Sequence, residues 1–339
     1  MACSLTKDIP FAAAIFVLTI ELCRWKQEPE RARLTKTRIQ ILLLVALVGL
    51  LRRNMIYAFI LIIPFLCIRP CRCLMDRRLS ALFLAGVVLL CGTEKGLKVA
   101  VQAEDAATIR ETMALPCQQL ARVYHLYGLS HPVGYEIRET LPYAENYAPE
   151  RADQAKRGAK ITTPDRLLRF GKLWLRESIH YPVEYLDAFL YTTRAYWDPT
   201  DFAYAYTYDM EADGPRGCLT TNHNVYAGVE QFDILPELRT LYHRLFTENA
   251  ALQQPVLPIL IHPAWSVWLL MFAAAWAAYE RRKDLLLPVL LNGCYLFTLL
   301  LGPCAIVRYS YYLMLCAPVL TAGLCCQKPS SLPEENKTA

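Results

Sequence analysis

Residues 39–68 read IQILLLVALVGLLRRNMIYAFILIIPFLCI, so two long apolar runs are separated only by Arg52, Arg53 and Asn54. Each run is shorter than the about 20 residues that cross a bilayer comfortably, but neutral flanking residues extend both to a plausible length. Buried helices of a soluble protein are the weaker alternative, because several more apolar runs follow along the chain. The stretch predicts two membrane-spanning helices joined by a tight turn.

Five further apolar runs accompany this pair, and hydrophobic residues make up 55% of the 339 residues. These runs are 11–23, 79–91, 256–279, 285–301 and 309–325. Together the runs predict an all-α integral membrane protein with about seven transmembrane helices. Residues 1–92 then hold about four spans, residues 256–326 hold about three, and residues 327–339 form a tail.

The polar middle of the chain, residues 93–255, is predicted to be one large extracytoplasmic domain between the fourth and fifth spans. Lys and Arg are enriched in short cytoplasmic loops. With seven spans, the basic loops 24–38, 69–78 and 281–283 all fall on one side, together with the C-terminal tail. That side of the cell membrane is therefore expected to be cytoplasmic. The turn between the second and third spans is the exception, because its two arginines fall on the outer side.

The extracytoplasmic domain is expected to be helical. Pro116 suits a first helical turn, and apolar residues recur at helical spacing from Leu115 to Tyr127. Further helices are expected from Pro164 to just before Pro182 and from about Val183 to Tyr196. A tyrosine-rich loop over 196–208 and a short amphipathic segment over 235–245 follow. The sequence shows no strand alternation and no internal repeat.

Composition and motifs argue against several other classes of protein. The net charge of +5 is small for this length and does not suggest a nucleic-acid partner, and no phosphate-binding loop or HExxH motif is present. Cys117 and Cys218 are the only cysteines in the polar domain, so either one disulfide or two free thiols is expected there. His125 with His131, or Cys218 with His223, lacks a third ligand. We therefore expect no metal and no other cofactor.

Charged residues at the outer ends of the spans are the candidate catalytic and binding groups. Asp8, beside Lys7, opens the first span as either a carboxylate facing an outer cavity or a simple headgroup-level charge. Arg308 opens the last span and either binds phosphate in a planar, bidentate way or snorkels to lipid headgroups. The 52–54 turn meets the same face and is expected to complete a phosphate-binding rim.

Two candidates lie in the polar domain. Gln118, Gln119 and Arg122 fall on adjacent helical surface, which suits either recognition of hydroxyl and phosphate groups or a solvated face. The Tyr196-Trp197 pair suits stacking on a sugar ring, and an aromatic belt at the membrane interface is an equal alternative.

Several of these stretches match one family in chain order. The chain resembles the C-terminal part of large bacterial membrane proteins related to GT-C glycosyltransferases, and it is similar to a Firmicutes-type family of that clan. The more specific motifs are the glutamine stretch and the Gly-Pro to Arg-Tyr element. The matching stretches are Thr6 to Phe11, Leu51 to Asn54 with Tyr57, Leu115 to Arg122, Lys172 to Leu175, Tyr181-Pro182, Tyr196-Trp197, and Gly302-Pro303 through Arg308-Tyr309.

The resemblance implies a membrane glycosyltransferase that takes a sugar from a polyprenyl-phosphate donor at the outer face. Such enzymes carry a catalytic aspartate on their first outer loop, which has no counterpart here, so we expect that an N-terminal part is missing. Asp8 matches a second acidic position and is the candidate catalytic residue. The candidate substrate-binding residues are Lys7, Arg52, Arg53, Asn54, Gln118, Gln119, Arg122, Trp197, Arg308 and Tyr309.

In the expected reaction, a carboxylate removes a proton from the acceptor hydroxyl as this hydroxyl attacks the anomeric carbon of the sugar. Arginine holds the leaving polyprenyl phosphate. The expected partners are the lipid-linked sugar, membrane lipid, and a cell-envelope glycan or protein acceptor. The alternatives are a transporter or flippase for lipid-linked saccharides, or a non-catalytic membrane assembly protein. A transporter should carry charged or polar residues inside its spans, whereas the charges here gather at span ends.

Overall fold

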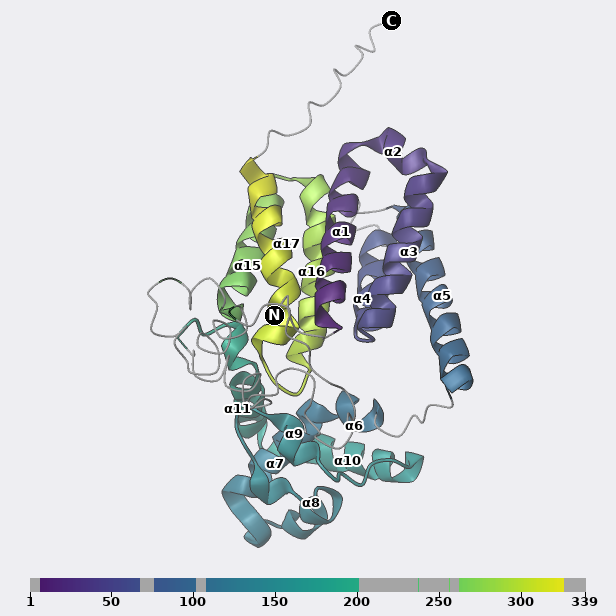
Figure 1. Cartoon of the computed structure of the whole chain (residues 1–339). Coiled ribbons are helices and arrows are strands. Elements are labelled where there is room, and N and C mark those ends of the chain that lie inside the picture. The colour runs from purple at the N-terminus through teal and green to yellow at the C-terminus, as the bar shows by residue number, and fades with distance from the viewer. Residues whose placement is uncertain are drawn as a thin grey trace, which may run out of the picture. The chain divides into compact units, whose positions relative to one another are not determined.

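The computed structural model describes residues 7–67, 76–101, 108–200 and 262–325, with Glu237 and Val256 as isolated positions. All regular secondary structure in these ranges is helical, so the all-α prediction is confirmed for this part of the chain. The chain divides into two compact units (Figure 1). We call residues 7–93, 266–295 and 311–339 the apolar unit, and residues 1–6, 94–265 and 296–310 the polar unit.

Each of the apolar runs forms a helix of its own (Figure 1). The helices are α1 (Asp8–Gln27), α3 (Thr35–Leu51), α4 (Met55–Cys67), α5 (Arg77–Val101), α15 (Pro263–Tyr279), α16 (Lys283–Leu300) and α17 (Val307–Cys325), with the short α2 (Pro29–Arg33) after α1. Within the described residues, Arg77–Leu97 is the one segment that is long and apolar enough to cross a membrane by length and composition. α4, α15 and residues Asp284–Leu300 are apolar but shorter. The count of about seven spans stays a prediction.

Aromatic rings and one amide join three helices inside the apolar unit. The ring of Phe11 on α1 lies 5.0 Å from that of Tyr295 on α16, which lies 4.8 Å from that of Tyr312 on α17. The buried Asn292 of α16 donates a hydrogen bond of 3.0 Å to the hydroxyl of Thr19 on α1. The hydroxyl of Tyr312 donates to the main-chain carbonyl of Asn292 at 3.2 Å. Polar groups thus bind α1, α16 and α17 to one another within an apolar interior.

Two glycines let α3 and α5 approach closely. A Cβ atom added to Gly86 of α5 would overlap the side chain of Val45 on α3. A Cβ added to Gly49 of α3 would likewise overlap Leu90 of α5. Small residues at such positions allow helix backbones to pack at short distance.

The outward faces of the apolar unit carry large hydrophobic side chains. These include Leu43 and Leu47 on α3, Ile60 and Phe65 on α4, Leu84 and Val88 on α5, and Trp268, Phe272 and Trp276 on α15. Soluble proteins rarely expose apolar surface of this extent.

Charged and polar contacts gather where α1 ends. Trp25 and Lys26 donate to one carboxylate oxygen of Asp76 at 2.9 and 3.3 Å. The amide of Gln27 donates to Asp284 at 3.1 Å, and this carboxylate also pairs with Arg282 at 2.8 Å. Asp76 and the Arg282–Asp284 pair therefore lie at the same end of the apolar unit as the C-terminus of α1.

The polar unit is built around α7 (Ala114–Tyr127), whose buried side chains form the centre of its hydrophobic core. The surrounding elements are α6 (Thr108–Thr112), η2 (Gly128–Ser130), α8 (Gly134–Thr140), η3 (Ala144–Asn146), α9 (Ala152–Lys156), α10 (Pro164–His180), α11 (Pro182–Thr193) and η4 (Arg194–Tyr196). The three helices predicted in this domain are confirmed, with Pro164 and Pro182 in the first turns of α10 and α11. Residues 201–208 and the segment 235–245, apart from Glu237, lie outside the described residues.

Cys117 is a free thiol inside this core. Burial raises the pKa of the Cys117 thiol to about 12. The thiol is therefore not the reactive thiolate form near neutral pH. Its possible partner Cys218, and His223 beside it, lie outside the described residues.

The glycine contact between α3 and α5 gives a stability prediction with a control on the same helix. Gly86→Ala should lower the free energy of unfolding by about 1–3 kcal/mol relative to Gly92→Ala, because the new methyl group overpacks against Val45. No heavy atom lies within 4 Å of a Cβ added to Gly92. Thermal unfolding of both variants in detergent, followed by size-exclusion chromatography, measures the difference. Equal melting temperatures would show that α3 and α5 do not pack through Gly86.

Candidate functional site

Asp8 and Arg52, both predicted from the sequence, form a direct ion pair in the apolar unit. Asp8 is the first residue of α1, where a carboxylate is favourable beside the helix N-terminus. Arg52 caps the C-terminus of α3, where a cation is favourable for the same electrostatic reason. The Asp8 side chain is 5% exposed and the Arg52 side chain 15%. The pair is thus shielded from water although it lies at helix ends.

Three other predicted residues surround this pair in sequence and are exposed. Lys7 precedes α1, and its carbonyl accepts the main-chain N–H of Phe11 at 3.2 Å. Arg53 and Asn54 form the turn between α3 and α4, and the carbonyl of Asn54 accepts from Tyr57 at 3.1 Å. The start of α1 and the turn after α3 therefore provide the water-shielded Asp8–Arg52 pair and, next to it in sequence, exposed polar side chains.

Arg308 and Tyr309 belong to the polar unit, in the first turn of α17. The Arg308 guanidinium lies 5.2 Å from the centre of the Tyr309 ring. One guanidinium nitrogen lies 3.4 Å from the Tyr309 hydroxyl, to which it donates. The phenol ring thus orients the arginine as a cation–π partner. A role in holding lipid phosphate stays a prediction.

Gln118 and Gln119 are buried and serve the interior of the polar unit. The amide of Gln118 donates to the carbonyl of Ala148 at 2.6 Å. Gln119 donates to the carbonyl of Tyr185 at 3.1 Å and accepts from the Trp174 indole at 2.8 Å. These bonds join α7 to α10, α11 and the segment after η3. The two glutamines therefore stabilise the fold of the polar unit. Substrate binding by either glutamine stays untested.

Arg122 lies beside the glutamines and joins α7 to α11. Its guanidinium pairs with Asp187 at 2.6 Å, donates to the Tyr147 hydroxyl at 3.4 Å and covers the Tyr191 ring at 5.4 Å. Desolvation acts to lower the pKa of Arg122, but the bonds to Tyr147 and Asp187 outweigh it and raise that pKa. An external phosphate would have to compete with Asp187 for this arginine.

Trp197 is 42% exposed and follows η4, so its indole remains accessible for stacking. Asp198 next to it pairs with Arg194 at 3.0 Å. The hydroxyl and main-chain N–H of Thr200 donate to the other Asp198 oxygen at 2.6 and 2.9 Å. These bonds from Thr200, helped by Arg194, lower the pKa of Asp198. The position of Trp197 is thus fixed by an ordered turn.

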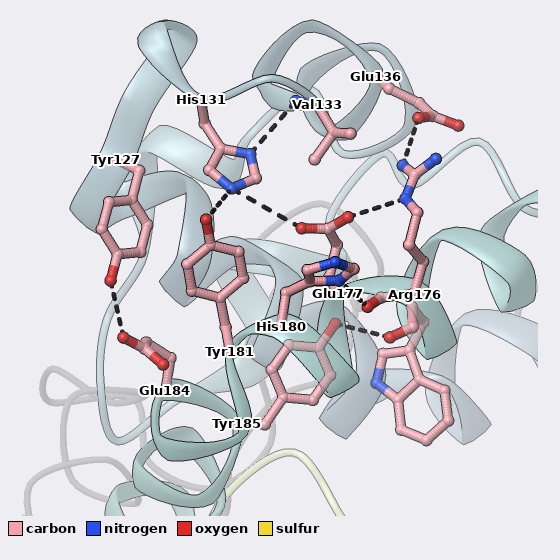
Figure 2. Close-up of polar contacts among 11 residues, drawn as sticks. Tyr127, His131, Val133, Glu136, Arg176, Glu177, His180, Tyr181, Glu184 and Tyr185 are labelled. Carbon is pink, nitrogen blue, oxygen red and sulfur yellow. Dashed lines mark hydrogen bonds and ion pairs between the residues drawn. The ribbon is translucent and has the colours of Figure 1, made fainter.

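A polar network that the sequence did not reveal joins η2, α10 and α11 (Figure 2). The Nε2 atom of the buried His131 lies 2.8 Å from the Tyr181 hydroxyl and 3.8 Å from a Glu177 oxygen. The main-chain N–H of Val133 donates to His131 Nδ1 at 3.3 Å, so the proton of the neutral ring belongs on Nε2. Arg176 pairs with the other oxygen of Glu177 at 2.9 Å.

This network extends to the surface through Glu136, which pairs with Arg176 at 2.8 Å (Figure 2). Beside it, the Tyr127 ring packs against that of Tyr181 at 5.0 Å, and the Tyr127 hydroxyl donates to Glu184 at 2.7 Å. The charge of the buried Glu177 carboxylate is balanced by the Arg176 guanidinium, so the network joins η2, α10 and α11 without an uncompensated charge. The Tyr181-Pro182 stretch was noted in the sequence, but nothing in the sequence predicted the contact of Tyr181 with His131, 50 residues earlier.

Within the described ranges, no group of three or more His, Cys, Asp or Glu side chains is arranged to hold a metal ion. His131 is instead bonded to Tyr181 and Val133, and the ring of His125 packs against Tyr147 at 5.2 Å.

The internal use of Gln119 is tested by Gln119→Leu. This variant leaves the Trp174 indole N–H and the Tyr185 carbonyl without their partner, which should lower the free energy of unfolding by about 1–4 kcal/mol. Gln154→Leu, at an exposed position of α9, is the control and should change stability by less than about 0.5 kcal/mol. Chemical denaturation followed by tryptophan fluorescence measures both. Equal stability of the two variants would rule out the structural role.

Comparison with known proteins gives one match. The family described as "Family of unknown function (DUF6020)" matches residues 1–338. No curated protein matches the chain, and no solved structure matches it. The expected relationship to GT-C glycosyltransferases therefore stays a prediction from the sequence. Since the family match extends over almost the whole length, the chain belongs to the family DUF6020.

Proposed function

We propose that the chain is an integral membrane protein with about seven spans and that the apolar unit is its membrane block. The exposed hydrophobic side chains on α3, α4, α5 and α15 support this, because they would face lipid tails rather than water. The α5 segment of suitable length and composition supports it as well.

The cytoplasmic side is the end of the apolar unit that carries Lys26, Asp76 and Arg282. α1 has 20 residues, so its two ends lie about 30 Å apart, which matches the hydrocarbon thickness of a bilayer. Lys26 and its partners mark one end, and Asp8 with Arg52 marks the other. The Asp8–Arg52 pair then belongs to the outer face, and the polar unit is extracytoplasmic.

At this outer face the protein transfers a sugar from a polyprenyl-phosphate donor to an acceptor hydroxyl. The single observation that carries this function is the water-shielded pair of Asp8 and Arg52. A buried ion pair contributes little to stability compared with well-packed apolar residues. Ionisable side chains that are shielded from water are therefore candidates for function, and a carboxylate beside an arginine suits a base next to a phosphate ligand.

The pair also suggests how the donor starts the reaction. The donor phosphate competes with Asp8 for Arg52, because arginine binds phosphate and carboxylate with the same planar fork. Asp8, released from Arg52, takes the proton of the acceptor hydroxyl. The hydroxyl oxygen bonds to the anomeric carbon, and the bond from that carbon to the phosphate oxygen breaks. The electron pair leaves with the polyprenyl phosphate, whose charge Arg52 balances.

Two single substitutions should affect donor binding in opposite directions. Asp8→Asn removes the competitor and should tighten binding of polyprenyl-phosphate hexoses or pentoses roughly tenfold or more, while sugar transfer falls by about 10² to 10⁴. Arg52→Ala should weaken donor binding by a similar factor and also abolish transfer. Calorimetry on the full chain in nanodiscs measures binding, and release of labelled sugar measures transfer.

Glu30→Gln and Arg33→Ala are matched controls, since these two residues form an exposed ion pair on α2 and should alter neither quantity. If Asp8→Asn weakens donor binding as Arg52→Ala does, Asp8 is not a competitor for the arginine. If the unsubstituted chain binds none of these donors, the donor class is wrong.

A transporter of lipid-linked saccharides is the second candidate, favoured by the polar group around Asn292 inside the apolar unit. The Asn292 amide donates to Thr19 and to the Pro288 carbonyl, and its buried oxygen accepts no hydrogen bond from any residue in the described part of the chain. Such groups within spans occur on transport pathways. Movement of a labelled lipid-linked saccharide across proteoliposomes without sugar release would favour this candidate over the transferase.

A further inference from the structure

Helix α10 of the polar unit presents an apolar stripe to solvent. Leu168, Leu175 and Ile179 are separated by seven and four residues, so they recur on one helical face. They are 60%, 56% and 78% exposed. The opposite face of α10 holds Phe170, Leu173 and Glu177, which are buried in the polar unit. The exposed stripe is therefore additional to the face that folds the unit.

A row of basic side chains runs along this stripe. Arg169, Lys172 and Arg176 follow one another at spacings of three and four residues and are exposed. Arg176 is already paired with Glu136 and Glu177, whereas no ion pair engages Arg169 or Lys172 among the described residues. One exposed acidic residue, Asp165, lies at the start of the helix. The exposed surface of α10 thus combines an apolar stripe with a neighbouring row of basic side chains.

From this pattern we infer that α10 docks on the surface of an anionic lipid bilayer. Helices that lie in the membrane interface combine an apolar face with flanking Lys and Arg, whose long side chains reach the headgroups. The next helix, α11, adds exposed Val183, Leu186 and Leu190. The polar unit also continues through the chain into α5, α16 and α17, so a bilayer would be its permanent neighbour. This inference rests on the proposed membrane block.

The test uses the full chain in nanodiscs of phosphatidylcholine, with or without about 30% phosphatidylglycerol. A benzophenone amino acid is placed at Ile179, and photo-adducts are identified by mass spectrometry. We expect lipid adducts at Ile179, enriched in phosphatidylglycerol. The same probe at Gln154, an exposed position of α9, should give no lipid adduct.

Charge reversal tests the basic row separately. Arg169→Glu with Lys172→Glu should lower the share of phosphatidylglycerol in the Ile179 adducts roughly fivefold or more, because each cation near an anionic surface contributes to binding. Lys160→Glu, an exposed cation outside α10, should leave that share unchanged. Thermal melting confirms that all variants are folded. An unchanged share in the double variant would overturn the electrostatic part of the inference.

A probe at Phe272, exposed on α15, separates this inference from the membrane proposal. Lipid adducts at Phe272 but not at Ile179 would overturn docking by α10 and leave the membrane block intact. Adducts at Ile179 to a second copy of the chain, or to another segment of the same chain, would overturn it as well. Lipid adducts at neither position would contradict both proposals.

Discussion

The ion pair of Asp8 and Arg52 is the contact on which the proposed chemistry depends. It fixes the start of α1 against the turn after α3, and neither partner can be removed without leaving a poorly hydrated charge. An apolar side-chain pair could join the same helices without that cost. The presence of two charges where packing would suffice is the physical reason to propose a chemical role for this position.

The helices could be predicted from the sequence because each apolar run is bounded by charges or turns. The run 39–51 stops just before Arg52, and the next run begins at Met55. In the structure α3 ends at Leu51 and α4 begins at Met55. Prolines at 164 and 182 likewise predicted where α10 and α11 begin. Such signals are local, since they depend on the preferences of neighbouring residues. For Asp8 and Arg52, the sequence predicted only that both lie at the outer face of the membrane, and it did not predict their ion pair.

Contacts between distant segments could not be predicted in this way. The surface of α7 that carries Gln118 and Gln119 looked equally suited to solvent or ligand, and only the packing of α10, α11 and the segment after η3 shows that it is buried. The network of His131, Glu177 and Tyr181 depends on tertiary structure across about 50 residues. Helical spacing predicted α10, but only burial distinguishes which of its apolar residues form the core and which are exposed.

The charge-swapped double variant, Asp8→Arg with Arg52→Asp, tests the role of this pair most directly. Each single change places two like charges together and should lower the melting temperature, whereas the swap restores an ion pair of the same kind. If Asp8 is the base and Arg52 the phosphate ligand, the swapped protein regains most of the melting temperature that the single variants lose, but it does not release sugar from a polyprenyl-phosphate donor. Sugar release at the unsubstituted rate would contradict a chemical role and leave the pair a purely structural one.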